Sequence, residues 1–222
     1  MNSPSAATPI RIDFVSDVVC PWCAIGLAAL EQAIARVGDE VAVELHVQPF
    51  ELDPDMAPDG EAVDEHLGRK YGLSAAQLEE NRARLRERGA QVGVDFAART
   101  RIHNTFDAHR LLHWAASEGR QLDLKRALLH AYFTEGEDVG DRGVLARIAA
   151  RAGLPADRAA AILATDGFAG EVRAHQQAFL RAGIASVPAT VFERQYLVSG
   201  GQPVEVFENV LRQVAGRKRG DA

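Results

Sequence analysis

The sequence predicts an α/β fold in which a large helical block interrupts a small sheet. A strand, a helix and a second strand follow one another between residues 10 and 47. No strand pattern occurs between residues 61 and 166, where apolar residues recur at helical spacing and glycines mark the helix ends. Strand patterns resume at residue 184. This order indicates one sheet domain that carries an insertion.

The domain boundaries follow from the same pattern. We predict a discontinuous sheet domain over 10–60 and 167–216, an inserted helical domain over 61–166, and flexible termini at 1–9 and 217–222.

Composition excludes several classes of protein. The 222 residues, 47% of them hydrophobic, are enough to bury a substantial core. The net charge is −6, and the basic run Arg217–Lys218–Arg219 lies at the C-terminal end, so we expect no nucleic-acid face. No apolar run approaches the ~20 residues of a membrane-spanning helix, which predicts no membrane association. The first nine residues lack the features of a secretory signal, so we expect a cytoplasmic protein.

The first strand is expected over residues 10–15, which are mostly apolar. A helix follows from Cys20 to Gly38, because Leu27, Leu30 and Ile34 recur at helical spacing. Residues 41–47 alternate between apolar and polar side chains and predict a second strand. A strand, helix and strand of this length form a βαβ unit, so the two strands should be parallel.

The inserted block should consist of short helices. Ser74, with Gln77 three residues later, is typical of a capping box at a helix start. Further helices are predicted at 105–117, 124–133, 144–152 and 156–163.

The last part of the chain returns to the sheet. A longer helix is expected over 168–182, with Gly183 as its C-cap. Residues 184–192 predict a strand, 196–198 a hairpin partner, and the segment from Pro203 a final helix with one apolar face.

The only two cysteines, Cys20 and Cys23, form a Cys-Pro-Trp-Cys motif at the start of the first helix. In this place one thiolate can attack a disulfide while its neighbour resolves the mixed intermediate. Pro21 suits the first turn of a helix, where its missing N–H would be unpaired. Unpaired N–H groups and the helix dipole favour an anion there, so Cys20 should be the more acidic thiol.

The alternatives for this pair are a zinc site and an inert dithiol. A structural zinc site needs four ligands, and no second cysteine pair exists. His109 and His113 lie four residues apart on one predicted helix, but the glutamate of a His-Glu-x-x-His site is absent. We therefore predict a redox role and no metal.

Three segments are similar to a known family. They are the run Ser16-Asp17-Val18-Val19-Cys20-Pro21-Trp22-Cys23, the segment Asn104-Thr105 with Ala108-His109-Arg110, and the Gly-Ile-x-x-Val-Pro-Ala-Thr segment that begins at Gly183. Together they resemble the FrnE-like cytoplasmic branch of the DsbA family. The resemblance covers about residues 10–214 and implies a thioredoxin-like fold with a large all-helical insertion.

The resemblance also implies roles for residues around the cysteine pair. Cys20 would attack, Cys23 would resolve, and Pro188 would be a cis-proline that faces them. Val187, before this proline, would offer backbone groups to an extended peptide. Asp13 matches a buried acid that shuttles protons, provided that one residue is inserted before Cys20; the alternative is a strand acid that faces solvent.

Substrate contacts are expected from Pro21, Trp22, Val187 and His109. Trp22 either contacts substrate or folds its ring over the helical block. His109 either reaches the cleft or belongs to a polar helix face. Asp17 would oppose ionisation of Cys20, and its loop position predicts that it is solvated and screened.

The predicted function is thiol–disulfide exchange that reduces or isomerises disulfides in proteins or small thiols. No bound cofactor is expected, and glutathione would serve as redox partner; the oligomeric state is left open. One alternative is a glutathione-dependent transferase or isomerase, because kappa-class transferases and 2-hydroxychromene-2-carboxylate isomerases have a similar architecture. Those relatives generally carry serine at the position of Cys20 and lack the second cysteine. A further alternative is a redox-inert peptide-binding chaperone.

Overall fold

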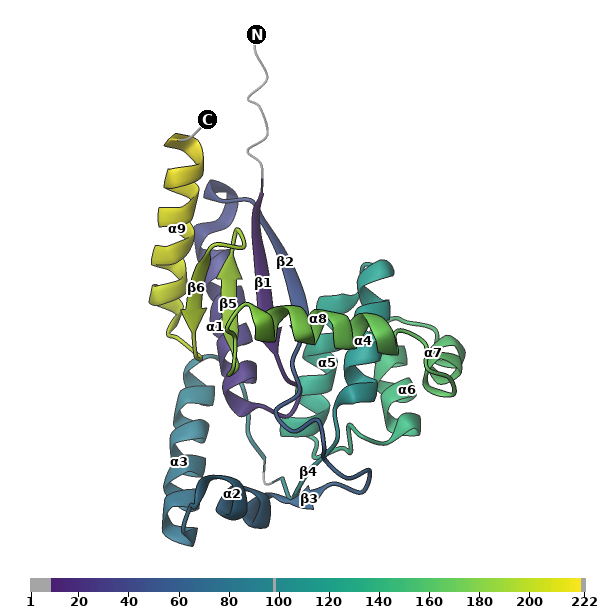
Figure 1. Ribbon diagram of the computed structural model, residues 1–222. Coiled ribbons are helices and arrows are strands. Elements are labelled where there is room, and N and C mark those ends of the chain that lie inside the picture. Colours follow the sequence, from purple (N-terminus) through teal and green to yellow (C-terminus); the bar gives the residue numbers. More distant parts are fainter. Residues whose placement is uncertain (1–8, 98, 221–222) are drawn as a thin grey trace.

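The computed structural model describes residues 9–97 and 99–220, and its centre is a four-stranded sheet (Figure 1). The strands are β1 (Ile10–Ser16), β2 (Val43–Pro49), β5 (Ala189–Phe192) and β6 (Tyr196–Ser199). Their order is β2-β1-β5-β6. β1 and β2 are parallel, as predicted for the βαβ unit, whereas β5 is antiparallel to both of its neighbours.

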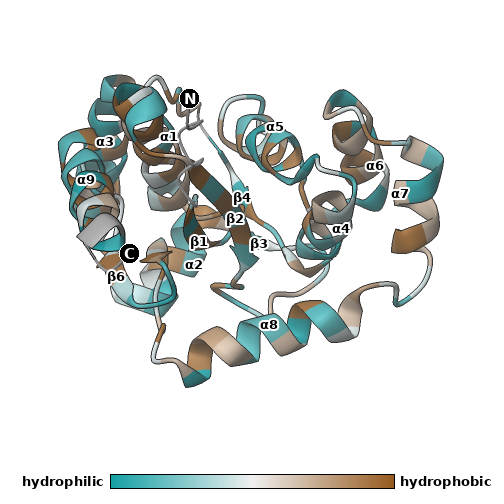
Figure 2. Cartoon of the chain, turned by 90° about the horizontal axis from the view of Figure 1, so that it is seen from above, coloured by the Kyte–Doolittle hydropathy of each residue, from teal (hydrophilic) through white to brown (hydrophobic). Residues whose placement is uncertain are grey.

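The helices form a layer on each face of this sheet and a cluster beyond its β2 edge. They are α1 (Pro21–Val37), α2 (Val63–Tyr71), α3 (Ala75–Gln91), α4 (Phe106–Ser117), α5 (Gln121–Phe133), α6 (Arg142–Arg151), α7 (Ala156–Leu163), α8 (Ala169–Arg181) and α9 (Val204–Gly220). A 3₁₀ turn, Gly38–Glu40, follows α1. α1 and α9 pack together on one face, and α8 crosses the other (Figure 2). α5 contacts β2 and connects the cluster α4–α7 to the sheet.

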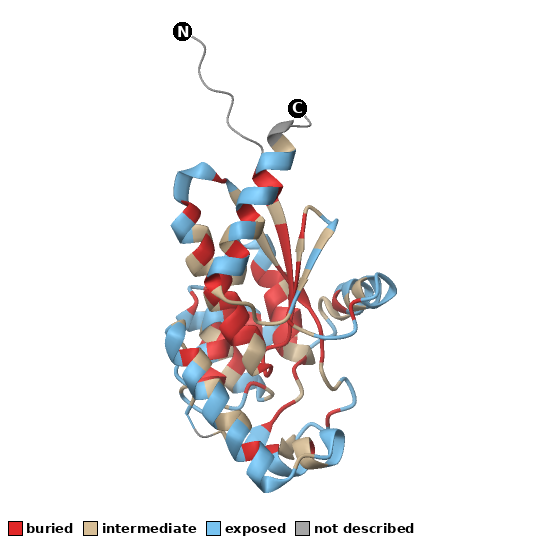
Figure 3. Cartoon of the chain, turned by 90° about the vertical axis from the view of Figure 1, so that its left-hand side faces the viewer, coloured by how far each residue is buried: buried red, intermediate tan, exposed pale blue. Residues whose placement is uncertain are grey.

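Strand β1 is buried along nearly its whole length because helices cover both faces of the sheet. Ile12, Phe14 and Val15 are fully buried. The buried residues gather on the strands and on the helix sides that face them (Figure 3). The sheet is thus a rigid support for the segment that follows β1.

The inserted block is helical, as predicted, but it also contains a small second sheet. β3 (Glu61–Ala62) pairs antiparallel with β4 (Arg101–Ile102). The prediction that no strand occurs here was wrong, because a two-residue strand is too short to produce an alternating pattern. The capping box is confirmed: the Gln77 N–H donates to the Ser74 hydroxyl, and the Ser74 N–H donates to the Gln77 side chain.

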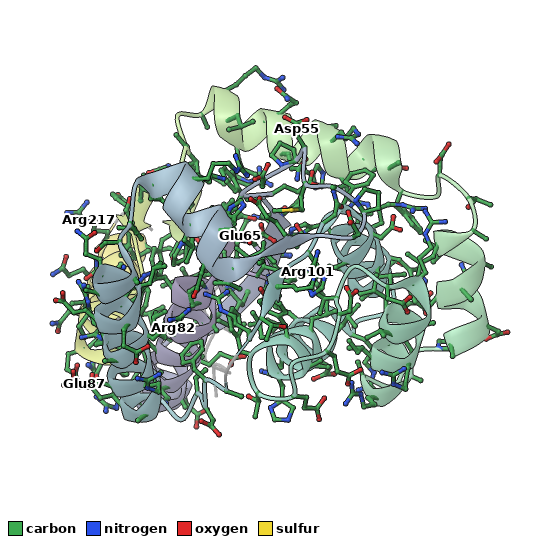
Figure 4. All side chains as sticks on the ribbon, turned by 90° about the horizontal axis from the view of Figure 1, so that it is seen from below. Asp55, Glu65, Arg82, Glu87, Arg101 and Arg217 are labelled. Carbon is green, nitrogen blue, oxygen red and sulfur yellow. The ribbon has the colours of Figure 1, made fainter. Side chains whose placement is uncertain are left out.

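Helices α2 and α3 lie at the end of the sheet where β1 ends and α1 begins (Figure 1). Gln32 on α1 donates to the Val92 carbonyl at the end of α3, with a distance of 2.9 Å. Glu65 and Glu87 are exposed on this pair, whereas Arg82 of α3 pairs with Asp64 of α2 (Figure 4). Exposed charges of this kind contribute little to stability, so the apolar contacts of the inner side hold the pair in place.

Two boundaries differ from the sequence prediction. β5 begins at Ala189, not at residue 184, because Pro188 has no N–H to donate to a neighbouring strand. α9 continues to Gly220, past the predicted boundary at 216, and Lys218 donates to the Glu193 carboxylate and the Pro9 carbonyl. The flexible segments predicted at the termini otherwise lie outside the described residues at 1–8 and 221–222. No helix of the described chain has the length and apolarity that a membrane crossing requires.

The turn after β6 packs tightly against the first turn of α1. A Cβ on Gly201 would lie 2.9 Å from the carbonyl oxygen of Trp22 and 3.5 Å from Cε3 of its ring. A Cβ on Gly26 would lie 3.2 Å from Cγ of Pro188. Small residues therefore let three segments meet around the cysteine motif.

We predict that Gly201→Ala destabilises the fold by about 1–3 kcal/mol, since the added methyl meets backbone that cannot move aside. Gly216→Ala on α9 is the matched control, because a Cβ there meets nothing within 4 Å. That change should stabilise the protein by up to ~1 kcal/mol. Urea unfolding of both variants measures the two changes in the free energy of unfolding. If the two variants were both stabilised or both destabilised, the packing argument would be wrong.

Candidate active site

The cysteine motif lies at the first turn of α1. Cys20 is the N-cap residue, with φ −86° and ψ 114°, and the Cys23 and Ala24 N–H groups donate to its carbonyl. Pro21 is the first helical residue. Extended backbone at Cys20 and helical backbone from Pro21 onward leave the first N–H groups of the helix facing the Cys20 sulfur.

The two thiols differ in acidity. The hydrogen bond from the Cys23 thiol is the largest effect that lowers the pKa of Cys20, and the backbone N–H groups of Cys23 and Trp22 add to it. Burial and the charge of Asp17 act in the opposite direction but do not cancel these donors. Burial raises the pKa of Cys23 well above its ordinary value. Cys20 is therefore the thiol that ionises first.

Val187 and Pro188 face the cysteine pair from the loop before β5. The Cys20 thiol donates to the Val187 carbonyl, with 3.8 Å between sulfur and oxygen. The Val187–Pro188 peptide bond is cis, and Pro188 is buried against Gly26 of α1. The structure thus brings together four of the residues that the sequence analysis selected: Cys20, Cys23, Val187 and Pro188.

Asp17 is buried, contrary to the prediction that it is solvated. Its side chain is 1% exposed and accepts from the Val18 N–H and the Leu52 N–H, each at 2.7 Å. His109 Nε2 lies 3.3 Å from the same carboxylate. The loop needs an acceptor for two backbone donors, and this requirement places the carboxylate inside the protein.

The environment of Asp17 keeps it ionised. Burial raises its pKa, but the hydrogen bond and charge of His109 and the Leu52 N–H outweigh burial, so the pKa of Asp17 lies below its ordinary value. A carboxylate three residues before Cys20 is thus a fixed negative charge beneath the dithiol.

Asp13 is buried as well, but its partners lie elsewhere. Its carboxylate accepts from Arg11, at 2.6 and 2.9 Å, and from Gln48 at 2.7 Å. It lines a cavity of about 440 Å³ between the sheet and α8. Among the described residues no hydrogen bond joins Asp13 to either cysteine, so its role in proton transfer stays a prediction.

His109 lies inside the fold and borders a cavity of about 190 Å³ between β2, α4 and α8. Its ring is 1% exposed and contacts Asp17, while its Nδ1 has no partner among the described residues. His113 packs against His175 and Phe168 instead. The described part of the chain holds no group of three or more residues arranged to bind a metal ion.

Pro21 and Trp22 are half-buried. The Trp22 ring lies beside Gly201, in the turn after β6. It therefore borders the cysteine motif on the side of the sheet domain. Its contact with substrate stays a prediction.

Two residues near the dithiol escaped the sequence analysis, and both come from the inserted block. Tyr71, at the end of α2, is 55% exposed, and its pKa is raised by burial of the phenol and by the charge of Cys20. Lys125, on α5, is fully buried. Burial lowers its pKa, and the charge of Cys23 is the largest effect in the opposite direction. Helical spacing could have indicated Lys125, because Leu124, Leu128 and Leu129 mark the inner side of α5.

We predict that Asp17→Ala destabilises the protein by about 2–5 kcal/mol, because it leaves the Val18 N–H, the Leu52 N–H and the His109 ring without their acceptor. Asp55→Ala is the control, since Asp55 is an exposed carboxylate on a nearby loop (Figure 4) and should change stability by less than ~0.5 kcal/mol. Equal costs in urea unfolding at pH 7 would show that Asp17 does not hold the loop.

The same pair of proteins should show a pH dependence. Because folding lowers the pKa of Asp17, its charge stabilises the folded state above the unfolded pKa of ~3.9. This contribution is lost as the pH falls through the folded pKa. The stability difference between wild type and Asp17→Ala should therefore shrink when unfolding is repeated near pH 3.

Comparison with known proteins identifies the family of the chain. The family described as DSBA-like thioredoxin domain matches residues 11–212. The crystal structure of the probable DsbA oxidoreductase SCO1869 from Streptomyces coelicolor is 38% identical and superposes with a TM-score of 0.88, over 93% of this chain and 90% of that chain. The uncharacterized protein YwbO of Bacillus subtilis is 26% identical over 210 residues, which are 94% of this chain and 99% of YwbO.

A more distant structure shares the fold. The cytosolic disulfide reductase DsbM from Pseudomonas aeruginosa, in a structure with GSH, is 18% identical with a TM-score of 0.61, over 91% of this chain and 98% of DsbM. The family match spans both parts of the sheet and the insertion between them. The chain therefore belongs to the DsbA-like family of thioredoxin-fold oxidoreductases.

Proposed function

We propose that the chain is a thiol–disulfide oxidoreductase that reduces or isomerises disulfides in proteins or small thiols. The observation that carries this proposal is the geometry of the motif: Cys20 is the N-cap of α1 and faces the Val187 carbonyl before a cis-proline, and Cys23 is buried one turn later. The pKa of Cys20 is lowered and that of Cys23 is raised, in agreement with this arrangement. A nucleophile that ionises readily and a neighbour that stays protonated until it is needed are the two parts of a dithiol exchange.

The reaction divides into two steps. The Cys20 thiolate attacks one sulfur of the substrate disulfide, so that a mixed disulfide forms and the first substrate thiolate leaves. The Cys23 thiolate then attacks Cys20 Sγ, which releases the second substrate thiolate and leaves a Cys20–Cys23 disulfide. The substrate gains two electrons and the enzyme loses two. In isomerisation the first substrate thiolate attacks another disulfide of the substrate. The thiolate that this attack releases then attacks the substrate sulfur of the mixed disulfide, so that a new substrate disulfide forms and the Cys20 thiolate leaves.

The direction of exchange follows from the compartment that we propose, the cytoplasm. Cytosolic glutathione is poised at roughly −220 to −260 mV by extraction, whereas a strong oxidant of the DsbA type lies near −120 mV. A gap of ~120 mV corresponds to about 5.5 kcal/mol for two electrons, so even such an oxidant would be held as a dithiol. The GSH in the DsbM structure supports a small thiol as the electron source.

Substrate would bind where the sheet domain meets α2. Trp22 and Val187 are half-buried at the dithiol, and Tyr71 is exposed and close enough for the charge of Cys20 to act on it. The Val187 carbonyl accepts from the Cys20 thiol, and ionisation of Cys20 removes that donor. The freed carbonyl can then accept from the N–H of an extended peptide.

The test is turnover of a scrambled disulfide protein in glutathione buffer. Wild type should reduce or reshuffle it, Cys20→Ser should lose both activities, and Cys23→Ser should accumulate mixed disulfides. Glutathione conjugation that survives in Cys23→Ser would favour the transferase alternative. Suppression of aggregation by the Cys20→Ser, Cys23→Ser double variant, without exchange in wild type, would favour the chaperone.

We predict that Tyr71→Ala lowers kcat/KM for a protein disulfide by about 5- to 30-fold, which corresponds to ~1–2 kcal/mol of lost binding. A small aromatic disulfide should be affected far less, because it need not reach Tyr71. Leu180→Ala, an exposed apolar residue on α8, is the control and should leave both rates unchanged. An equal loss with both substrates would place Tyr71 in the chemistry instead of in protein recognition.

A further inference from the structure

Arg99 of the inserted block contacts the chain directly before the attacking cysteine. Its Nη1 donates to the Val19 carbonyl at 3.3 Å and to the Tyr132 hydroxyl at 3.4 Å. The carbonyl carbon of Val19 is bonded to the nitrogen of Cys20, so the guanidinium touches the peptide unit that leads into Cys20. A permanent cation from outside the sheet domain is thus held beside the place where exchange is proposed to begin.

Two aromatic rings hold this guanidinium in place. Its Cζ lies 5.2 Å from the ring centroid of Phe133 and 5.7 Å from that of Tyr132. Both residues belong to α5 and are 1% exposed. Tyr132 is fixed in turn, because its hydroxyl donates to the Arg101 carbonyl at 2.9 Å. An arginine that is already stacked and hydrogen-bonded loses little further freedom when it binds a ligand.

One edge of the Arg99 guanidinium has no partner in the described part of the chain. Nη1 makes both of its hydrogen bonds, whereas Nε and Nη2 make none. Neither of these two nitrogens is among the enclosed atoms that lack a partner, so both are open to a ligand. The N–H groups of Nε and Nη2 lie parallel on this edge and match the two oxygens of a carboxylate.

Arg99 also borders a cavity of about 350 Å³, whose walls come from α2, α3 and the chain before β4. Apolar residues form much of the wall, among them Leu67 of α2, Leu78 of α3 and Phe96. Small-molecule sites have volumes of roughly 300–1,000 Å³, mostly apolar walls and a few polar groups that fix the ligand. This cavity is therefore suited to an anion with a short hydrocarbon chain.

The charges around the cavity leave Arg99 as its unpaired cation. Arg82 and Arg86 border the cavity as well, but both pair with Glu79, and Arg82 also pairs with Asp64. No carboxylate of the described residues pairs with Arg99. An anionic substrate would supply that partner, and a neutral or cationic substrate would not.

We infer that Arg99 binds a carboxylate of the substrate, so that the preferred substrates are disulfides with a carboxylate a few atoms from their sulfur. This inference rests on the proposed thiol–disulfide exchange and names the substrate class for it. The carboxylate would lie on the edge formed by Nε and Nη2, and the substrate disulfide would face the Cys20 sulfur. The exchange then proceeds as described above, and no atom of Arg99 forms or breaks a bond.

Two small disulfides of equal length test the inference. 3,3′-Dithiodipropionate carries a carboxylate at each end, and 3,3′-dithiodipropionamide carries a neutral amide in its place. Quenched-flow counts of free thiols give the rate at which each disulfide oxidises the reduced protein at pH 7. Division by the rate with dithiothreitol removes the intrinsic difference in reactivity. Wild type should favour the diacid by about 10- to 100-fold, the range for one charge-assisted hydrogen bond.

Variants assign this preference to one residue. Arg99→Gln should lower the diacid rate by about 10- to 100-fold and leave the diamide rate within about twofold. Arg99→Lys keeps the charge but loses the paired N–H groups, so it should recover part of the preference. Arg84→Gln is the matched control, because Arg84 is exposed on α3, donates to Asn81 and does not border the cavity. Both of its rates should equal those of wild type.

The carboxylate can belong to a small molecule or to a protein, and peptide disulfides separate these sources. A peptide disulfide with glutamate beside its cysteine is compared with the same peptide carrying glutamine. A preference for the glutamate peptide supports the inference with proteins as substrates. A preference confined to dithiodipropionate supports it with a small disulfide as the substrate.

Two results would overturn the inference: equal normalised rates of the diacid and the diamide with wild type, or an equal loss with both in Arg99→Gln. The second result would show that Arg99 only supports the loop before Cys20, because a structural defect does not depend on the charge of the substrate. If neither disulfide oxidises the cysteine pair of wild type, the proposed function itself fails, which is distinct from failure at Arg99 alone.

Discussion

The cysteine motif depends on one buried carboxylate. Between the end of β1 and the start of α1 the chain must change direction within four residues. Asp17 accepts hydrogen bonds from the backbone N–H groups of Val18, in this turn, and of Leu52. Because the same carboxylate also contacts His109 of α4, it joins the loop to the inserted block. The position of Cys20 at the helix start is therefore set by a contact between the two parts of the chain, as well as by the strand before it.

This anchor has an electrostatic cost that the rest of the site offsets. The charge of Asp17 raises the pKa of Cys20, which is the opposite of what an attacking thiol requires. The Cys23 thiol and the N–H groups of Cys23 and Trp22 outweigh it, because they donate directly to the sulfur whereas Asp17 acts at a distance. Cys23 has no comparable set of donors and lies deeper, so burial dominates its acidity. The difference in acidity between the two thiols thus follows from helix geometry and depth.

Sequence reasoning predicted what depends on local patterns and missed what depends on tertiary contacts. The spacing of Cys20 and Cys23, the parallel pair β1 and β2, and the capping box at Ser74 are each encoded within a few residues. We predicted that Asp17 is solvated because a loop residue is usually exposed. Only the fold shows that two backbone N–H groups need its carboxylate as their acceptor. Tyr71 and Lys125 lie about 50 and 100 residues beyond the motif, and no local signal connects either of them to it. Arg110, which was selected as part of a family segment, donates instead to the carbonyls of Ile162 and Gly167 and so ties α4 to the segment after α7.

The inserted block is more than a cover for the sheet edge. His109 from α4, Lys125 from α5 and Tyr71 from α2 come from three helices of the insertion. His109 contacts the anchor Asp17, the charge of Cys23 acts on Lys125, and the charge of Cys20 acts on Tyr71. The sheet domain supplies the two sulfurs, the helix start and Asp17, whereas the insertion adds His109, which contacts Asp17, and Lys125, whose charge lowers the pKa of Cys23. Because those residues act on the site from outside its own segment, a change in the insertion can alter the site without altering the motif. Two chains with the same Cys-x-x-Cys sequence can for this reason differ in chemistry.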